Sequence, residues 1–173
     1  MIDVGPYVRQ GAMPHGPLRL GDGKRTVAQA GCLLSCLVMC ARAVTPQKTL
    51  TVMGAQAMID DAAGFLGSSL RLSVAAKALG MVLEERAKLS IDAVRKSLDE
   101  GCPVILGVDY KPGASSGFSD ADHFVLAVSA DAATVRFADP ATGLPDATEW
   151  RRPVYRGHPC DFSEMVRVSG LRQ

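Results

Sequence analysis

The sequence has no run of basic residues, no long apolar stretch and few aromatic side chains. Its 19 Lys and Arg residues nearly balance its 18 Asp and Glu residues, so the net charge is +1. A nucleic-acid-binding protein usually carries a concentrated positive surface, which this composition does not provide. The longest apolar stretch, residues 32–41, is far shorter than the roughly 20 residues of a membrane span. We therefore expect no nucleic-acid partner and no membrane span.

A secretory signal and a disulfide framework are missing as well. Residues 1–17 contain no basic flank followed by an apolar segment. The number of cysteines is odd, at five, and three of them crowd together at Cys32, Cys36 and Cys40. This pattern is typical of free thiols in a reducing compartment. We expect the protein to fold in a cytoplasm, and to leave it only by a route without a signal or as part of a phage particle.

The composition that remains is that of an ordinary globular protein. Apolar residues make up 47% and charged residues 21% of the 173 positions. We predict one domain over residues 1–173, with an irregular Gly- and Pro-rich arm (1–27), a mainly helical half (28–100) and a mainly sheet half (101–170). Because the helices precede the strands, the predicted fold class is α+β.

Four helices are predicted from apolar periodicity and capping residues. The first is apolar on all sides, as expected of a buried helix. Their expected starts are Cys32, Thr45-Pro46, Ser68 or Ser69, and Ser90. The third is expected to end at Gly80 and the fourth at Gly101.

The second half of the chain predicts strands. Residues 103–108, 124–130 and 134–139 are β-branched or alternating segments. Residues 131–133 form a connection short enough for an antiparallel hairpin between the last two. Residues 165–168 indicate one further strand near the end of the chain.

Cys32 is the best placed of the thiols for chemistry. A thiol reacts as its thiolate, and the unpaired N–H groups and dipole at a helix start favour that form. Gly31 lets the chain enter the helix closely and leaves room for a substrate carbonyl. Cys36 and Cys40 follow one and two turns later on nearly the same face, where we expect them to pack in the core instead of binding a metal, since no CxxC pair accompanies them.

His123 and Asp139 complete a possible triad. Of the three histidines, His15 lies in the Gly/Pro arm and His158 in a Gly-His-Pro turn, whereas His123 opens a strand that would hold its ring. Asp139 ends the next strand, so a hairpin between the two would bring its carboxylate beside the imidazole. Taken alone, His123 would be an ordinary polar residue and Asp139 before Pro140 a turn former.

With these three residues in their sequence contexts, the chain resembles the bacteriocin-processing, double-glycine type of papain-like cysteine peptidases of bacteria and phages. The matching stretches are TVAQAGCLLSCLVM at 26–39, EGCPVILGV at 100–108, DHFVLAV at 122–128 and ADPATG at 138–143. They occur in the order of that family over residues 25–145. The joint pattern is specific, while each stretch alone is not.

The resemblance implies a papain-like fold and a cysteine hydrolase that cleaves a peptide or amide bond through a thioester. Cys32 would be the nucleophile, His123 the base and Asp139 its orienting acid, with no metal or organic cofactor. Relatives place a Gln a few residues before the nucleophile as an oxyanion donor, and Gln29 is the nearby candidate. The backbone N–H of Cys32 and the Ser35 hydroxyl are alternatives.

Several alternatives stay open on the sequence alone. The same triad serves peptidoglycan amidases and endopeptidases and deamidating toxins. The expected substrate is therefore a peptide or a protein, and a peptidoglycan peptide is one of the options. A catalytically inactive relative would instead be a binding or structural module. Cys160 near His158 is a less natural thiol–imidazole pair because Pro159 separates them. Residues 110–122, rich in Gly and Ser, are expected to form a mobile rim over the cleft, and a solvated loop is the alternative.

Overall fold

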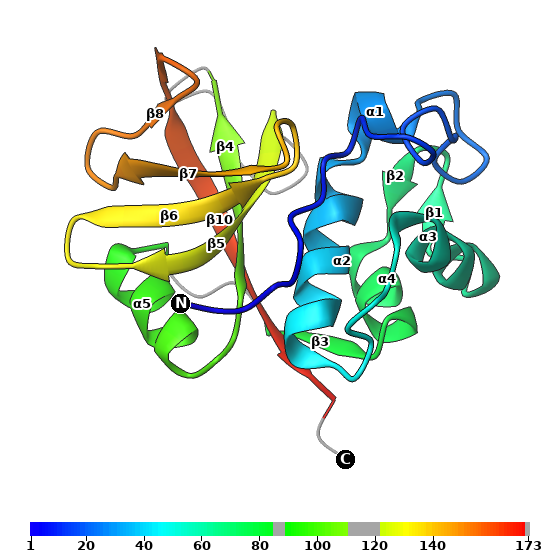
Figure 1. Ribbon diagram of the computed structural model, residues 1–173, viewed down its shortest axis with the longest axis horizontal. Helices are drawn as coiled ribbons and strands as arrows, with labels where there is room; N and C mark the ends of the chain where they lie inside the picture. Colours follow the sequence, from blue (N-terminus) through cyan, green and yellow to red (C-terminus); the bar gives the residue numbers. More distant parts are fainter. Residues whose placement is uncertain (85–88, 111–121, 172–173) are drawn as a thin grey trace.

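The computed structural model describes residues 1–84, 89–110 and 122–171 and shows an α+β fold (Figure 1). Its helices are α1 (Val27–Ala30), α2 (Cys32–Val44), α3 (Val52–Asp61), α4 (Leu72–Ala78) and α5 (Ile91–Asp99). Its strands are β1 (Phe65–Leu66), β2 (Ser69–Leu70), β3 (Met81–Glu84), β4 (Val104–Asp109), β5 (His123–Ala130), β6 (Thr134–Asp139), β7 (Leu144–Glu149), β8 (Val154–Tyr155), β9 (His158–Pro159) and β10 (Asp161–Gly170). Helices dominate the N-terminal half, and an antiparallel sheet dominates the C-terminal half.

Six strands form the main sheet in the order β3-β10-β4-β5-β6-β7, with every neighbouring pair antiparallel. Helix α2 packs on one face of this sheet and α5 on the other (Figure 1). Because both faces are covered, the central strands are apolar on both sides. In β5, Phe124 and Leu126 belong to the core beside α2, whereas Val125 and Ala127 belong to the core beside α5.

Helix α2 is the central element of the first core. All eight residues from 34 to 41 are buried, which agrees with their apolar character on every side of the helix. The helix contacts β5 and β10 on the sheet and α3 on its other side. Among the residues that the structure describes, no helix combines the length and the apolar character needed to cross a membrane.

The clearest sequence predictions are confirmed. Helix α5 follows Ser90, whose side chain accepts a hydrogen bond from the Ala93 N–H at 3.1 Å, and Gly101 beyond it has a φ of +76°. The three predicted strands are β4, β5 and β6, and residues 131–133 connect the last two as an antiparallel pair. Residues 165–168 lie in β10, a ten-residue strand between β3 and β4.

Two predicted helix starts are wrong. Thr45 does not cap a second helix, because its hydroxyl donates to the Ala41 carbonyl at 2.7 Å and so closes the end of α2. The next helix begins only at Val52, where Thr51 accepts a hydrogen bond from Gly54. Ser68 and Ser69 do not cap the third helix either, since residues 65–70 form the β1-β2 pair first. At Thr45 a hydroxyl contact within the preceding helix competes with capping, and at Ser68 and Ser69 a short strand pair does.

The N-terminal arm, residues 1–27, lies against both halves of the molecule (Figure 1). Its backbone bonds to β5 through Ile2 N–H and Val128 O at 2.8 Å, and the carbonyl of Pro6 accepts from the Arg42 side chain of α2 at 2.8 Å. Further along, Gln10 N–H donates to the carbonyl of Pro140 at 2.8 Å. The arm is thus part of the packed structure, and it carries Gln10 to the end of β6.

We predict that the arm depends on Gly143. A Cβ added to this residue would lie 2.7 Å from the Cβ of Arg9, and its φ is +72°. Gly101 is the matched control, because its φ is +76° but no described atom lies within 4 Å of an added Cβ. Both Ala variants should lose about 1–2 kcal/mol of stability from backbone strain, and Gly143→Ala should lose roughly 1–3 kcal/mol more from overpacking. Urea unfolding measures the difference, and equal losses would contradict a tight arm contact at this position.

Candidate active site

Cys32 is the first residue of α2 and is partly exposed. Its backbone N–H belongs to the first turn, where N–H groups have no acceptor within the helix. Gly31 permits this arrangement, since a Cβ there would lie 2.4 Å from the Val27 carbonyl oxygen of α1. The close helix entry predicted from the sequence is therefore present, because Val27 fills the space that a side chain at position 31 would need.

The β5-β6 pair brings His123 and Asp139 together. Leu126 lies opposite Ala138, which places the end of β6 beside the start of β5. Both side chains lie on the α5 side of the sheet, because His123 is two residues from Val125 and Asp139 is two residues from Phe137, which both belong to that core. His123 Nε2 donates to Asp139 Oδ1 at 2.8 Å, and the two side chains are 7% and 1% exposed. Solvent therefore has almost no access to the His123–Asp139 pair.

The Asp139 carboxylate is held by three further groups. The backbone N–H of Ala141 donates to Oδ1 at 2.8 Å, which is the turn contact expected of Asp before Pro. The hydroxyl of Tyr155 in β8 donates to Oδ2 at 2.9 Å, and Thr142 makes a longer contact of 3.4 Å with the same oxygen. Asp139 therefore forms the turn and orients His123 at the same time.

The electrostatics of the pair favour a protonated imidazole beside a carboxylate. Burial by itself lowers the pKa of His123, but hydrogen bonds with Asp139 and with the Cys32 thiol, together with the charges of both groups, raise it to about 9. Burial opposes the charged form of Asp139 too, yet hydrogen bonds from His123 and Ala141 keep the pKa of this carboxyl below its usual value. Burial and the Asp139 charge raise the pKa of Tyr155, so its hydroxyl remains a donor.

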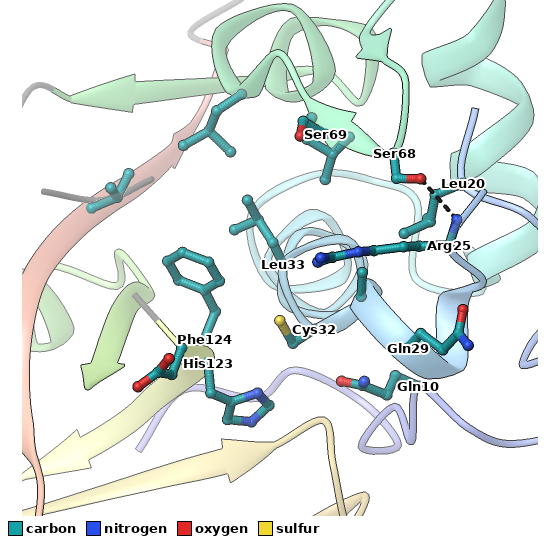
Figure 2. A pocket seen from close by; sticks show the side chains of 15 residues that line it. Gln10, Leu20, Arg25, Gln29, Cys32, Leu33, Ser68, Ser69, His123 and Phe124 are labelled. Atoms are coloured by element: carbon teal, nitrogen blue, oxygen red, sulfur yellow. Dashed lines mark hydrogen bonds between the residues drawn. The ribbon is translucent and has the colours of Figure 1, made fainter. Parts of the chain in front are cut away.

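Cys32 and His123 both line a cavity of about 690 Å³ (Figure 2). The Cys32 thiol lies near enough to the ring to contribute to the raised pKa of His123. Because Nε2 faces Asp139, Nδ1 is the nitrogen left for Cys32. We call this space the active-site cavity; its walls include Leu20, Arg25, Leu33, Ser69, Phe124 and Val166. The structure thus brings the three residues predicted from the sequence together: His123 is hydrogen-bonded to Asp139 and lines the same cavity as Cys32.

The side chains considered as oxyanion donors differ in how they lie relative to the cavity. Gln29 lines the cavity, but its side-chain carbonyl accepts from the Thr26 N–H at 3.0 Å in a capping box, and in Figure 2 the side chain points away from Cys32. Gln10 from the arm directs its amide toward His123 (Figure 2). The hydroxyl of Ser35 is buried and is not among the groups that line the cavity.

The remaining thiols and imidazoles lie elsewhere. Cys36 and Cys40 are fully buried in α2, and burial raises the pKa of both thiols. Burial raises the pKa of Cys160 to about 11, and His158 beside it is exposed in β9. His15 bonds the Arg9 carbonyl within the arm. Cys32 is therefore the thiol with both access and an imidazole partner.

Two expectations from the sequence concern metals and a rim. Among residues 1–84, 89–110 and 122–171, no three His, Cys, Asp or Glu side chains gather as metal ligands. The rim expected over residues 110–122 falls almost wholly on residues 111–121, which lie outside the described part of the chain.

Sequence reasoning missed Tyr155 and Gln10. The Tyr155 ring lies 5.4 Å from the His123 ring and 5.5 Å from the Tyr110 ring, measured between centroids, so it shields the imidazole as well as binding Asp139. Nothing in the local sequence around either residue marks it, because each reaches the site from a distant segment. Only the tertiary structure identifies them as neighbours of the site.

The sequence was also compared with models of known protein families and with curated proteins, and neither comparison gives a match.

We predict that Tyr155→Phe destabilises the protein by about 1.5–3 kcal/mol, because it removes a buried hydrogen bond to a charged carboxylate. Tyr7→Phe is the control, since Tyr7 is also a partly buried tyrosine that packs on the core, but its hydroxyl has no hydrogen bond among the described residues. Its change in stability should stay within about 0.5 kcal/mol. Urea unfolding at pH 7 measures both. An equally small effect of both variants would show that the Asp139 contact adds nothing to stability.

Proposed function

We propose that this protein is a cysteine hydrolase with a papain-like fold that cleaves a peptide or amide bond. The observation that carries the proposal is that Cys32 and His123 line the same cavity while His123 is hydrogen-bonded to the buried Asp139 carboxylate at 2.8 Å. A nucleophile at a helix start, packed against an antiparallel sheet that holds the base and the acid, supports the papain-like assignment.

The reaction follows from the protonation states of these groups. The Cys32 thiolate attacks the carbonyl carbon of the scissile bond, while His123 carries the proton on Nδ1. Collapse of the tetrahedral intermediate breaks the C–N bond, and His123 gives its proton to the leaving amine. Neutral His123 then takes a proton from water as the water oxygen attacks the thioester carbon. The C–S bond breaks, which releases the acid and restores the Cys32 thiolate beside protonated His123. Asp139 keeps the ring oriented and stabilises its charged form.

Gln10 is the residue we propose as a side-chain donor to the oxyanion, together with the Cys32 N–H. One N–H of its amide donates to the Ala28 carbonyl at 2.9 Å, which fixes the side chain and leaves the second N–H free. Its carbonyl oxygen is buried and has no partner among the described residues. The Ala28 contact also ties Gln10 to α1, the helix directly before the nucleophile. Preorganised donors of this kind stabilise the developing charge without reorganisation.

The direct test is the rate of iodoacetamide labelling at each cysteine, followed by peptide mass mapping. At pH 6 we expect Cys32 to react at least about tenfold faster than the other four thiols, because the protonated imidazole stabilises its thiolate. His123→Ala should remove this advantage. His158→Ala is the matched control, since His158 is exposed and lies outside the active-site cavity.

Equally slow labelling of all five thiols in the wild-type protein would overturn the proposal. That outcome would favour the alternative of a binding module without catalytic activity. Fast labelling of Cys32 that persists in His123→Ala would also contradict the assignment of His123 as its partner.

A second prediction concerns the titration of His123. Its ring should titrate near pH 9, and Asp139→Asn should lower this midpoint, because the variant removes the charge that stabilises the imidazolium. Since the folded pKa lies above the usual value of about 6.5, the group stabilises the fold fully below pH 6.5, and this contribution is lost as the pH rises through about 9.

Histidine NMR titration measures the midpoint, and urea unfolding at pH 7 and pH 10 measures the loss of stability. Asp146→Asn on the exposed strand β7 is the control, since its carboxylate bonds only the neighbouring Ala147 N–H among the described residues. An unchanged His123 midpoint in Asp139→Asn would rule out Asp139 as its electrostatic partner.

A further inference from the structure

The active-site cavity contains a positive charge that the triad does not use. Among the described residues that line it, Arg25 is the one Lys or Arg side chain. In Figure 2 its side chain extends into the cavity toward Leu33, on the wall next to the start of α2. The guanidinium is exposed, so a ligand in the cavity can reach it.

The backbone of Arg25 is fixed on both sides. Its N–H donates to the Ser68 hydroxyl at 3.0 Å, and its carbonyl accepts from the Leu20 N–H at 2.9 Å. Gly23 packs so closely on the β1-β2 turn that an added Cβ would lie 2.3 Å from the Ser68 nitrogen. The arm therefore presents the guanidinium from a rigid base, which lowers the entropy lost when a ligand binds.

The guanidinium has no carboxylate partner within the described residues. Asp122, the acidic residue of the described lining, accepts instead from the Tyr110 N–H at 2.9 Å. Arg167 shows the contrast, since it pairs with Glu84 and Glu100 at 2.6 and 2.7 Å. An arginine that serves the fold is thus paired, while Arg25 points its donors into the cavity.

The walls around Arg25 suit a specific anion. Leu20, Leu33 and Phe124 provide apolar surface, and Ser69 adds a hydroxyl on the neighbouring strand. In such surroundings a guanidinium binds a carboxylate through two parallel hydrogen bonds, with less competition from water than on an open surface.

We propose that Arg25 binds a substrate carboxylate close to the scissile bond, so that the enzyme acts on acidic peptides or amides. This inference rests on the proposed hydrolase function, because it names the substrate class of the same cavity. The carboxylate is that of an acidic side chain or of a chain terminus, since both present the same two oxygens to the guanidinium.

Two small alkylating agents test the proposal without a known substrate. Iodoacetate carries a carboxylate next to its reactive carbon, whereas iodoacetamide is neutral and of nearly equal size. At Cys32, the labelling rate with iodoacetate divided by the rate with iodoacetamide should fall about fivefold in Arg25→Gln. A nearby unit charge changes the free energy of binding an anion by this order. Lys24→Gln is the control, because it removes the same charge from the next residue, which does not line the cavity.

An unchanged ratio in Arg25→Gln, or an equal fall in Lys24→Gln, would overturn the proposal. Failure of the hydrolase function is a separate result, since it appears as slow iodoacetamide labelling in the wild-type protein. Synthetic peptide pools then distinguish the two sources of carboxylate. Preference for Glu over Gln pools indicates a side chain, preference for free over amidated termini indicates a terminal carboxylate, and equal cleavage of all pools contradicts selection by charge.

Discussion

The carboxylate of Asp139 is the group on which the site depends. It is 1% exposed, and a buried charge is stable only when its oxygens are satisfied by hydrogen bonds. The partners come from three segments: the His123 ring of β5, the Ala141 backbone in the following turn and the Tyr155 hydroxyl of β8. One charge therefore joins the local turn, the sheet and a distant hairpin. The orientation of His123 is a consequence of this demand for hydrogen bonds.

The position of Cys32 depends on the opposite face of the sheet. Helix α2 packs against β5 and β10, while His123 and Asp139 project on the side of α5. The thiol and the imidazole meet because both lie at the ends of their elements, Cys32 at the start of α2 and His123 at the start of β5. A site at the ends of packed elements is open to a substrate, yet each side chain is held by a rigid element.

The N-terminal arm supplies polar side chains to the site from outside the helical and sheet halves. Gln10 and Arg25 both reach the active-site cavity from residues 1–27, a segment without helix or strand up to α1. Backbone bonds to Val128 and Pro140 and contacts with Ser68 hold it in place. An irregular segment can place polar groups where neither a helix nor a strand would direct them, because its backbone follows no fixed period.

The sequence by itself determined most of the local elements and the choice of three candidate site residues. Buried α2, the Ser90-capped α5, strands β4 to β6 and the candidates Cys32, His123 and Asp139 all follow from periodicity, capping and residue type, because these signals act over a few neighbouring residues. The helix starts at Thr45 and Ser68 were misplaced, since the competing contacts are equally short in range.

Only the tertiary structure decided how distant segments meet. Three features join segments that are separated along the chain: the place of β10 between β3 and β4, the contact of Tyr155 with Asp139, and the position of Gln10 in the cavity that Cys32 lines. No local pattern encodes them, because their partners are chosen by the packing of the two cores and by the need to satisfy buried polar groups.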